Sequence, residues 1–234
     1  MLHTSPDIIT QRIAEVKETI AKACLKIGKD PKKIIIVAVT KTVSPSNIIA
    51  GINAGLTIMG ENRIQEAKEK ISQINNPNVE WHLIGHLQTN KAKEAVRLFN
   101  LIHSVDNFKV AQELSKWAVI YEKNLSILIQ VNIAGEETKS GIALVDVKEL
   151  INNIMKLKNL SVKGLMIIPP YNPEPEKSRP YFRQLYTLAE GFRKDSLLGV
   201  EMSYLSMGMS NDFEVAIEEG ANMVRLGTAI FGKR

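Results

Sequence analysis

The sequence predicts an α/β protein built as a single (β/α)8 TIM barrel, and three observations point to this fold class. Short apolar, β-rich runs recur at a fairly regular interval along the 234 residues. Stretches with helical periodicity separate these runs, so the elements alternate as they do in right-handed βαβ units with a parallel sheet. The length is close to the ~250 residues that such barrels commonly need. We therefore expect one domain over residues 1–234, with an extra helix at the N-terminus.

Eight apolar runs are the expected strands, and four of the intervening segments carry the clearest helical pattern. The strands are expected at 33–40, 56–60, 79–85, 101–105, 126–132, 162–168, 202–207 and 223–230. The helices are expected at 62–74, 107–121, 145–157 and 179–192, and a further short helix at 213–218. The polar stretch 134–141 and the proline-rich segment 169–180 are interpreted as rim loops inside one domain.

The segment before the first strand has the signals of a complete helix. Ser5-Pro6-Asp7 is a start signal and Gly28 is a stop signal. Because only two residues follow Phe231-Gly232, no helix is expected after the eighth strand. We therefore expect the N-terminal helix to fill the vacant place in the outer ring. Its apolar stripe consists of Ile9, Ile13, Val16, Ile20, Ala23 and Ile27.

Lys41 closes the apolar run 34–40 and is the centre of the functional prediction. A lysine at the mouth of a hydrophobic layer is expected to be shielded from water, which favours its neutral amine. A neutral amine is a nucleophile toward aldehydes, and pyridoxal 5′-phosphate (PLP) is the natural partner. The alternative is a lysine that caps the strand and extends into solvent. PLP would also need a phosphate cradle and a group facing its ring nitrogen.

Two segments near the C-terminus offer these two features. Ser206-Met207-Gly208-Met209-Ser210 follows a strand and precedes a helix, where a glycine and free N–H groups suit a phosphate; an ordinary capped turn is the alternative. Arg225 lies inside an apolar strand, so it is expected to meet an acid, a phosphate or a ring acceptor. Gly227-Thr228 can donate to the same phosphate. The polar candidates at the carboxyl ends of the strands are Lys41, Asn62, His86, Gln88, Ser104, Asp106, Asn132, Met166, Ser206 and Arg225.

Composition and charge argue against several other classes of protein. The net charge is +5, but basic residues are interleaved with acids, as in Glu66-Ala67-Lys68-Glu69-Lys70, which is typical of a solvated surface rather than a nucleic-acid site. No apolar stretch is long enough to span a bilayer, and no signal peptide is visible. Cys24 is the only cysteine, which suits a cytoplasmic protein. The four histidines have no metal-ligand spacing, so no metal site is expected.

Six segments together resemble the YggS/PROSC family of PLP-binding homeostasis proteins. The resemblance runs from end to end and in order, and the segments at 81–91 and 205–210 are highly specific; the one departure is Thr40, where serine is common. The segments are AVTK at 38–41, GEN at 60–62, WHLIGHLQTNK at 81–91, GLM at 164–166, LSMGMS at 205–210 and VRLGT at 224–228.

The resemblance implies a barrel like the N-terminal domain of alanine racemase, with PLP held as an internal aldimine on Lys41. It implies no catalytic residues and no metal ligands, and it implies that Lys139 takes part in handling PLP. The implied cofactor-binding residues are Lys41, Asn62 near the ring, Arg225 at the pyridine nitrogen, and Ser206, Met207, Gly208, Gly227 and Thr228 at the phosphate.

The expected function is therefore that of a carrier or regulator in PLP homeostasis, affecting amino-acid and keto-acid balance, and not that of an enzyme. An arginine at the pyridine nitrogen keeps the ring unprotonated and weakens it as an electron sink. Recipients would be PLP-dependent apoenzymes, and a cytoplasmic monomer is expected. The alternatives are a weak PLP-dependent amino-acid racemase, a barrel that binds another phosphorylated metabolite, and, last, a nucleic-acid-binding protein.

Overall fold

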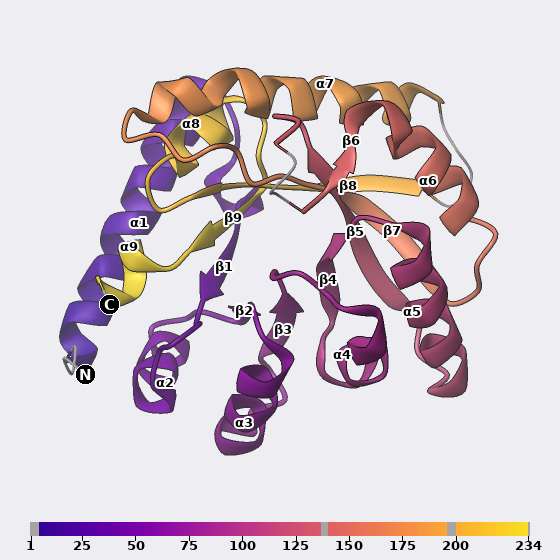
Figure 1. The fold of residues 1–234 in the computed structure, drawn as a ribbon. Coiled ribbons are helices and arrows are strands. Elements are labelled where there is room, and N and C mark those ends of the chain that lie inside the picture. Colours follow the sequence, from indigo (N-terminus) through magenta and orange to yellow (C-terminus); the bar gives the residue numbers. More distant parts are fainter. Residues whose placement is uncertain (1–4, 137–139, 196–199, 234) are drawn as a thin grey trace.

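The computed structural model describes residues 5–136, 140–195 and 200–233, and eight parallel strands close into a barrel (Figure 1). Their order is β4-β3-β2-β1-β9-β8-β7-β5, and the pairing of β4 with β5 completes the ring. The bounds are β1 Ile35–Val39, β2 Ile58–Glu61, β3 Glu80–Leu83, β4 Leu101–Val105, β5 Leu125–Asn132, β7 Leu160–Met166, β8 Val200–Met209 and β9 Met223–Leu226. The predicted (β/α)8 barrel is confirmed.

Helices form an outer ring around the strands, and capping residues mark several of their starts. Ser44 and Asn107 accept backbone N–H bonds at the starts of α2 and α5. All four helices predicted from periodicity are present, with ends that differ by a few residues. The bounds are α2 Pro45–Asn53, α3 Ile64–Ile74, α4 Ala92–Leu98, α5 Phe108–Ile120, α6 Val147–Ile154, α7 Arg179–Asp195 and α8 Phe213–Glu218.

The N-terminal helix α1 (Pro6–Lys26) completes the outer ring, as predicted. Ser5 caps its first turn, and α1 contacts α2, α8 and the short helix α9 (Thr228–Phe231), so it lies where the two ends of the barrel sequence meet (Figure 1). Ile13 and Ile20 are buried, which confirms the apolar stripe. The prediction was wrong for Ile27, which is 40% exposed because the helix ends before it.

The eighth strand differs from the prediction. It stops at Leu226, and a one-turn helix, α9 (Thr228–Phe231), follows it where no helix was expected. The apolar residues Ile230 and Phe231, which suggested a longer strand, are buried against the outer ring instead. A second difference is the short strand β6 (Ile142–Ala143), which pairs with β5 outside the barrel order.

The core has two layers that follow from the alternation of side chains along each strand. The larger layer lies between the strands and the helices. The smaller layer fills the barrel interior and contains Val37, Val39, Ile84, Leu101, Leu128, Met166 and Met223. Val37 and Val39 therefore face the barrel interior, and Lys41 lies in the turn just beyond the carboxyl end of this strand.

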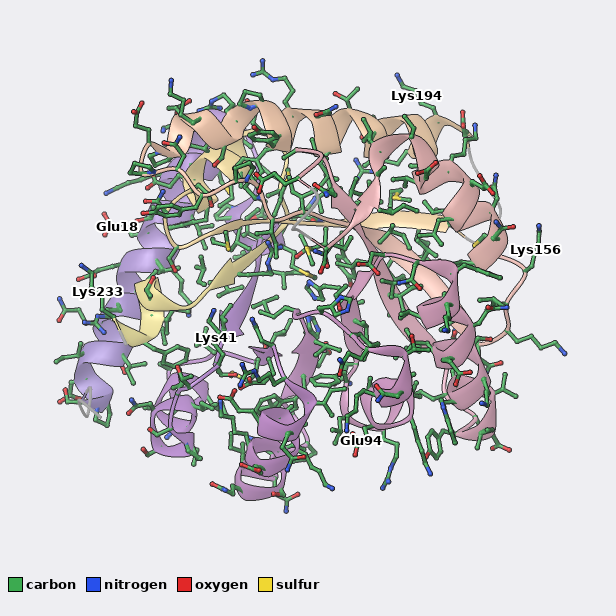
Figure 2. The ribbon with its side chains drawn as sticks, in the orientation of Figure 1. Glu18, Lys41, Glu94, Lys156, Lys194 and Lys233 are labelled. Carbon is green, nitrogen blue, oxygen red and sulfur yellow. The ribbon has the colours of Figure 1, made fainter. Side chains whose placement is uncertain are left out.

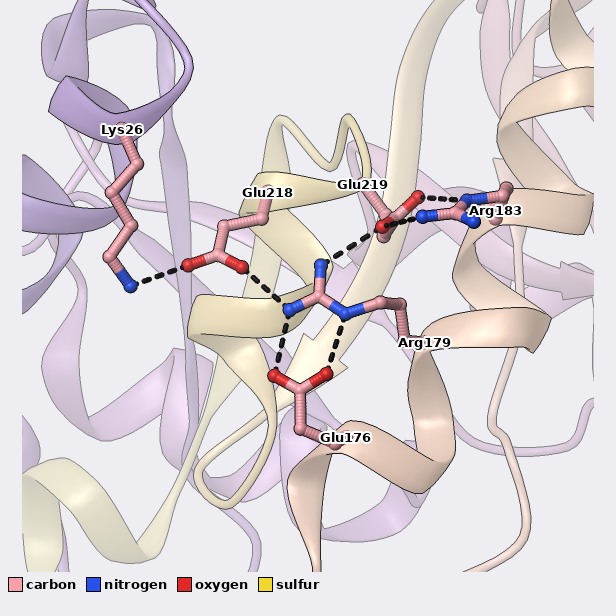
Figure 3. Close-up of polar contacts among 6 residues, drawn as sticks. All are labelled: Lys26, Glu176, Arg179, Arg183, Glu218 and Glu219. Atoms are coloured by element: carbon pink, nitrogen blue, oxygen red, sulfur yellow. Dashed lines mark hydrogen bonds and ion pairs between the residues drawn. The ribbon is translucent and has the colours of Figure 1, made fainter.

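A cluster of ion pairs joins α1, α7 and α8 on the outside of the barrel (Figure 3). Arg179 donates to Glu218 at 2.7 Å and to Glu219 at 2.9 Å, and Lys26 reaches Glu218 at 2.7 Å. These contacts hold the pKa of Glu218 and of Glu219 below the ordinary carboxyl value, chiefly through their hydrogen bonds to Lys26 and Arg183 respectively. The members are Lys26, Glu176, Arg179, Arg183, Glu218 and Glu219.

None of the helices formed by the described residues combines the length and apolar character that crossing a membrane requires.

Candidate functional site

Lys41 lies in the turn that follows β1, and its side chain is exposed (Figure 2). Within the described ranges it makes no hydrogen bond or ion pair. The expectation that Lys41 is shielded from water is therefore wrong for this structure, because the strand ends at Val39 and Lys41 already belongs to an exposed turn. The position at the mouth of the barrel is as expected, and the amine is accessible to a ligand there.

Arg225 lies inside the barrel on β9, and its side chain is almost fully buried. Its Nη1 donates to the carbonyl and the hydroxyl of Ser206, both at 2.7 Å, and its Nη2 donates to the carbonyl of Ile167 at 2.7 Å. An acid was one of the three partners considered for Arg225, and it is not seen: across residues 5–136, 140–195 and 200–233, no carboxylate forms an ion pair with Arg225. Neutral carbonyls and a hydroxyl orient the guanidinium instead.

The charge of Arg225 therefore remains uncompensated by an ion pair in the barrel interior. Burial lowers the pKa of Arg225 to about 10, and Asp212 opposes this shift. The group is still a cation at neutral pH, since this pKa stays far above 7. A buried cation without a paired acid favours the binding of an anion nearby.

Two buried histidines extend the polar contacts of Ser206 across the interior. His103 Nδ1 lies 3.0 Å from Ser206 Oγ, and His103 Nε2 lies 3.1 Å from His82 Nδ1. His82 Nε2 is 3.5 Å from a carboxylate oxygen of Glu80. Burial lowers the pKa of His103 well below its ordinary value, and the neighbouring His82 and Arg225 add to the effect. Burial lowers the pKa of His82 as well.

The Glu80 carboxylate sets the direction of hydrogen bonding along this chain. It can only accept, so neutral His82 must carry its proton on Nε2 and accept at Nδ1. His103 then donates from Nε2, and its Nδ1 accepts from the Ser206 hydroxyl. The lone pairs of that hydroxyl accept from Arg225. Ser206 was predicted as a phosphate ligand, but in this structure its hydroxyl donates to His103 and accepts from Arg225.

Ser206, Met207 and Gly208 all lie within β8, which runs further than predicted, to Met209. All three are buried. Gly208 has φ of +91°, and a Cβ there would lie 2.6 Å from the Ala216 side chain on α8. A side chain at position 208 would therefore clash, so the glycine is required by close packing of α8 on β8.

Ser210 is the polar group that faces the exit of β9, and the sequence analysis did not single it out. Its Oγ accepts from the backbone N–H of Gly227 at 3.2 Å and of Ala229 at 3.1 Å. Two backbone donors thus converge on one oxygen, an arrangement that a phosphate oxygen can also satisfy. Thr228 is exposed beside them. The second serine of the S-M-G-M-S motif is the sequence signal that could have identified Ser210 as a site residue.

Asn62 follows β2 and lines a cavity of about 360 Å³ at the same end of the barrel. His86 and Gln88 line it too. Two other predicted polar residues at this end differ from each other: Asp106 accepts from the backbone N–H of Gly141 at 3.1 Å, whereas Ser104 Oγ is buried with no partner among the described residues.

The strand order brings the predicted PLP residues to one side of the barrel. Strands β2, β1, β9 and β8 are consecutive neighbours. Arg225 on β9 pairs with Val37 of β1 on one side and with Met209 of β8 on the other. An accessible amine, a buried cation and converging backbone donors therefore lie on adjoining strand ends, a donor set that fits an aldehyde bearing an anionic phosphate. Lys139 falls outside the described residues. Those residues hold no group of three or more side chains that could ligate a metal.

The comparisons with known proteins agree with this class of site. The family model of the alanine racemase N-terminal domain matches residues 18–234. The "Pyridoxal phosphate homeostasis protein" of Aquifex aeolicus is 44% identical over 226 residues, covering 96% of this chain and 97% of that protein. The protein of the same name from Escherichia coli K12 is 38% identical, with 97% of both chains covered. The chain belongs to the alanine racemase N-terminal domain family and, within it, to the pyridoxal phosphate homeostasis proteins.

Solved structures support the fold over the same length. PipY of Synechococcus elongatus, determined with PLP bound, has a TM-score of 0.84 and 31% identity, and covers 96% of this chain and 100% of that chain. A lysine/ornithine decarboxylase of Vibrio vulnificus has a TM-score of 0.71 at 14% identity and is covered over 62% of its length. The second likeness shows only a shared barrel.

Proposed function

We propose that this protein holds PLP by a covalent imine link to Lys41 and acts in PLP homeostasis as a carrier or regulator, without robust catalysis. The observation that carries the proposal is the convergence of Lys41, Arg225 and the Ser210–Gly227 contact on neighbouring strand ends. The relatives named as PLP homeostasis proteins and the PLP-bound PipY structure support the cofactor. Asn62, on the next strand exit, would lie near the ring.

The phosphate would be held at the exits of β8 and β9. The backbone N–H groups of Gly227 and Ala229 now donate to Ser210 Oγ. They could donate to a phosphate oxygen if the Ser210 side chain rotated away or if the hydrogen bonds became bifurcated. Met207, Gly208 and Thr228 are the further residues proposed to surround the phosphate. Ser206 contributes indirectly, since it holds the Arg225 side chain in position.

Arg225 favours a binding role over catalysis. A bound PLP supplies an aldehyde that exchanges between amines and a ring that can act as an electron sink. A cationic guanidinium facing the ring nitrogen disfavours protonation of that nitrogen, and the ring is then a weaker sink. We propose that the recipients of PLP are apoenzymes and that the protein works as a cytoplasmic monomer of one domain.

The test is an absorbance spectrum of the purified protein before and after borohydride, followed by mapping of any reduced adduct. We expect an adduct on Lys41, whereas Lys41→Ala should form none yet still bind some PLP through the phosphate contacts. Lys29→Ala is a control, since that lysine lies on the other end of the barrel, against the carbonyls of Gly220 and Ala221. An adduct of unchanged yield in Lys41→Ala would refute the proposal.

A further inference from the structure

The two peptide groups that flank Lys41 are both held by charged side chains from α3. The Thr40 carbonyl, on the N-terminal side, accepts from Lys70 Nζ at 2.6 Å. The Thr42 N–H, on the C-terminal side, donates to Glu66 Oε1 at 2.5 Å. The backbone of the site lysine is thus fixed immediately before and immediately after its Cα atom.

These contacts belong to one compact set of ionic groups, which we call the α3 clamp and define as Glu61, Glu66 and Lys70. Lys70 Nζ lies 2.7 Å from Glu61 Oε1 and 2.6 Å from Glu66 Oε1. The Thr40 hydroxyl donates to the same Glu61 oxygen at 2.6 Å. Lys70 therefore bridges the end of β2, the end of β1 and the first turns of α3.

Two members of the clamp, Glu61 and Lys70, are buried, which is unusual for a glutamate and a lysine. Glu61 is 0% exposed and Lys70 is 6% exposed. Burying an ion pair in place of apolar side chains of similar volume seldom stabilises a fold. Moreover, Glu61 Oε2 is buried and has no partner among the described residues. Simple packing of α3 on the barrel does not explain such a choice of residues.

The turn that the clamp holds is one that would not keep its shape unaided. Thr42 has φ of +58°, in the left-handed region that β-branched residues rarely adopt. Such a backbone persists only where surrounding contacts over-determine it. Because this turn begins directly after β1, its shape decides where the Lys41 side chain lies at the carboxyl end of the strand.

We propose that Glu61, Glu66 and Lys70 are positioning residues, which fix the backbone on both sides of Lys41 so that its amine meets a bound aldehyde at the barrel mouth. This inference rests on the proposed function, because it assumes that Lys41 is the residue that links to PLP. The clamp does not touch the cofactor. It governs how much of the bound PLP is linked covalently, and the phosphate contacts on β8 and β9 govern how much is bound at all.

The test compares Lys70→Met with Lys123→Met in the full chain. Lys123 is a matched control, since it is a half-buried lysine that also donates to two backbone carbonyls, those of Val96 and Phe99, at 2.8 and 2.6 Å. The first readout is the fraction of bound PLP that borohydride fixes to Lys41. The second, made without PLP, is hydrogen exchange of the Thr42 amide.

In Lys70→Met we expect the trapped fraction to fall and Thr42 amide exchange to rise, each by about tenfold or more, because charge-assisted hydrogen bonds are lost. Total PLP binding should persist. In Lys123→Met both readouts should match the wild type, even though stability falls. Glu66→Ala, a change on a partly exposed helix position, should reproduce the effect of Lys70→Met, and it decides the question if Lys70→Met does not fold.

Wild-type trapping and Thr42 exchange in Lys70→Met or Glu66→Ala would overturn the inference and leave the proposed function intact. Equal losses in Lys123→Met would also overturn it, since the effect would then follow general stability. Absence of a Lys41 adduct in the wild type would overturn the proposed function, and with it the purpose assigned to the clamp. Restoration of the trapped fraction by Lys70→Arg would support positioning by a cation.

Discussion

Replacing Ser206 by alanine should destabilise the barrel far more than replacing Ser104, although both serines are fully buried. The Ser206 hydroxyl accepts from Arg225 Nη1 at 2.7 Å and donates to His103 Nδ1. A hydrogen bond to a charged group contributes about 1.5–3 kcal/mol, and an unsatisfied buried acceptor on His103 costs about 1–3 kcal/mol. Because Arg225 Nη1 keeps its hydrogen bond to the Ser206 carbonyl, we expect the free energy of unfolding to fall by about 2–4 kcal/mol.

Ser104→Ala should have the opposite sign. Its hydroxyl is buried without a partner among the described residues, so removing it also removes an unsatisfied polar group. We expect unchanged stability or a gain of about 1 kcal/mol.

Urea unfolding without added PLP measures both variants. At a slope of about 2–3 kcal/mol/M, Ser206→Ala should unfold at roughly 1 M lower urea than the wild type, with the same slope. Equal midpoints for Ser206→Ala and the wild type would refute the proposed chain from Arg225 through Ser206 to His103. A loss in Ser104→Ala as large as that in Ser206→Ala would also refute the reasoning, since the effect would then be one of packing.

The ion-pair cluster and two glycines give further expectations. Arg179→Met should lower the free energy of unfolding at pH 7 by about 1–2 kcal/mol, and the loss is no larger because water partly screens the cluster. Lys148→Met removes a cation from an exposed ion pair and should change the free energy of unfolding by less than about 0.5 kcal/mol. Because the folded pKa of Glu218 is lowered, its contribution is present above the ordinary value of 4.5 and is lost as pH falls through the lower folded pKa, so acid titration of stability should bring Arg179→Met and wild type together. Gly164→Ala should abolish soluble expression, since the added Cβ would lie 1.9 Å from a carbonyl oxygen of β8. Gly191→Ala on α7 meets nothing within 4 Å and should raise the melting temperature.

The barrel followed from the sequence because it depends on patterns that local residues carry, and the same patterns place the candidate site residues at or near the ends of its strands. The apolar run before Lys41 and the buried position of Arg225 were both visible as strand residues. The eighth strand was placed too long because Ile230 and Phe231 are as apolar as strand residues, although they belong to the one-turn helix α9. Apolar character alone does not distinguish a strand from one buried turn of helix.

The contacts between distant segments were not predictable in the same way. Lys70 belongs to a stretch of alternating charges that was interpreted as a solvated surface, yet it is buried against Glu61. Nothing in the local pattern separates it from Lys68, which is exposed. The pairing of His82 with His103, and of Ser210 with Gly227, likewise depends on the barrel register.

The pairing of β1 with β9 places Val37 opposite Arg225, and these strands come from opposite ends of the sequence. Contacts between such distant segments have a cost in loop-closure entropy and slow folding. Partly folded chains that lack this pairing would keep Lys41 and Arg225 apart. Retention of PLP would therefore distinguish fully folded molecules from nearly folded ones. Because a ligand that binds only the folded state stabilises it, a higher concentration of PLP would raise the folded fraction of this protein.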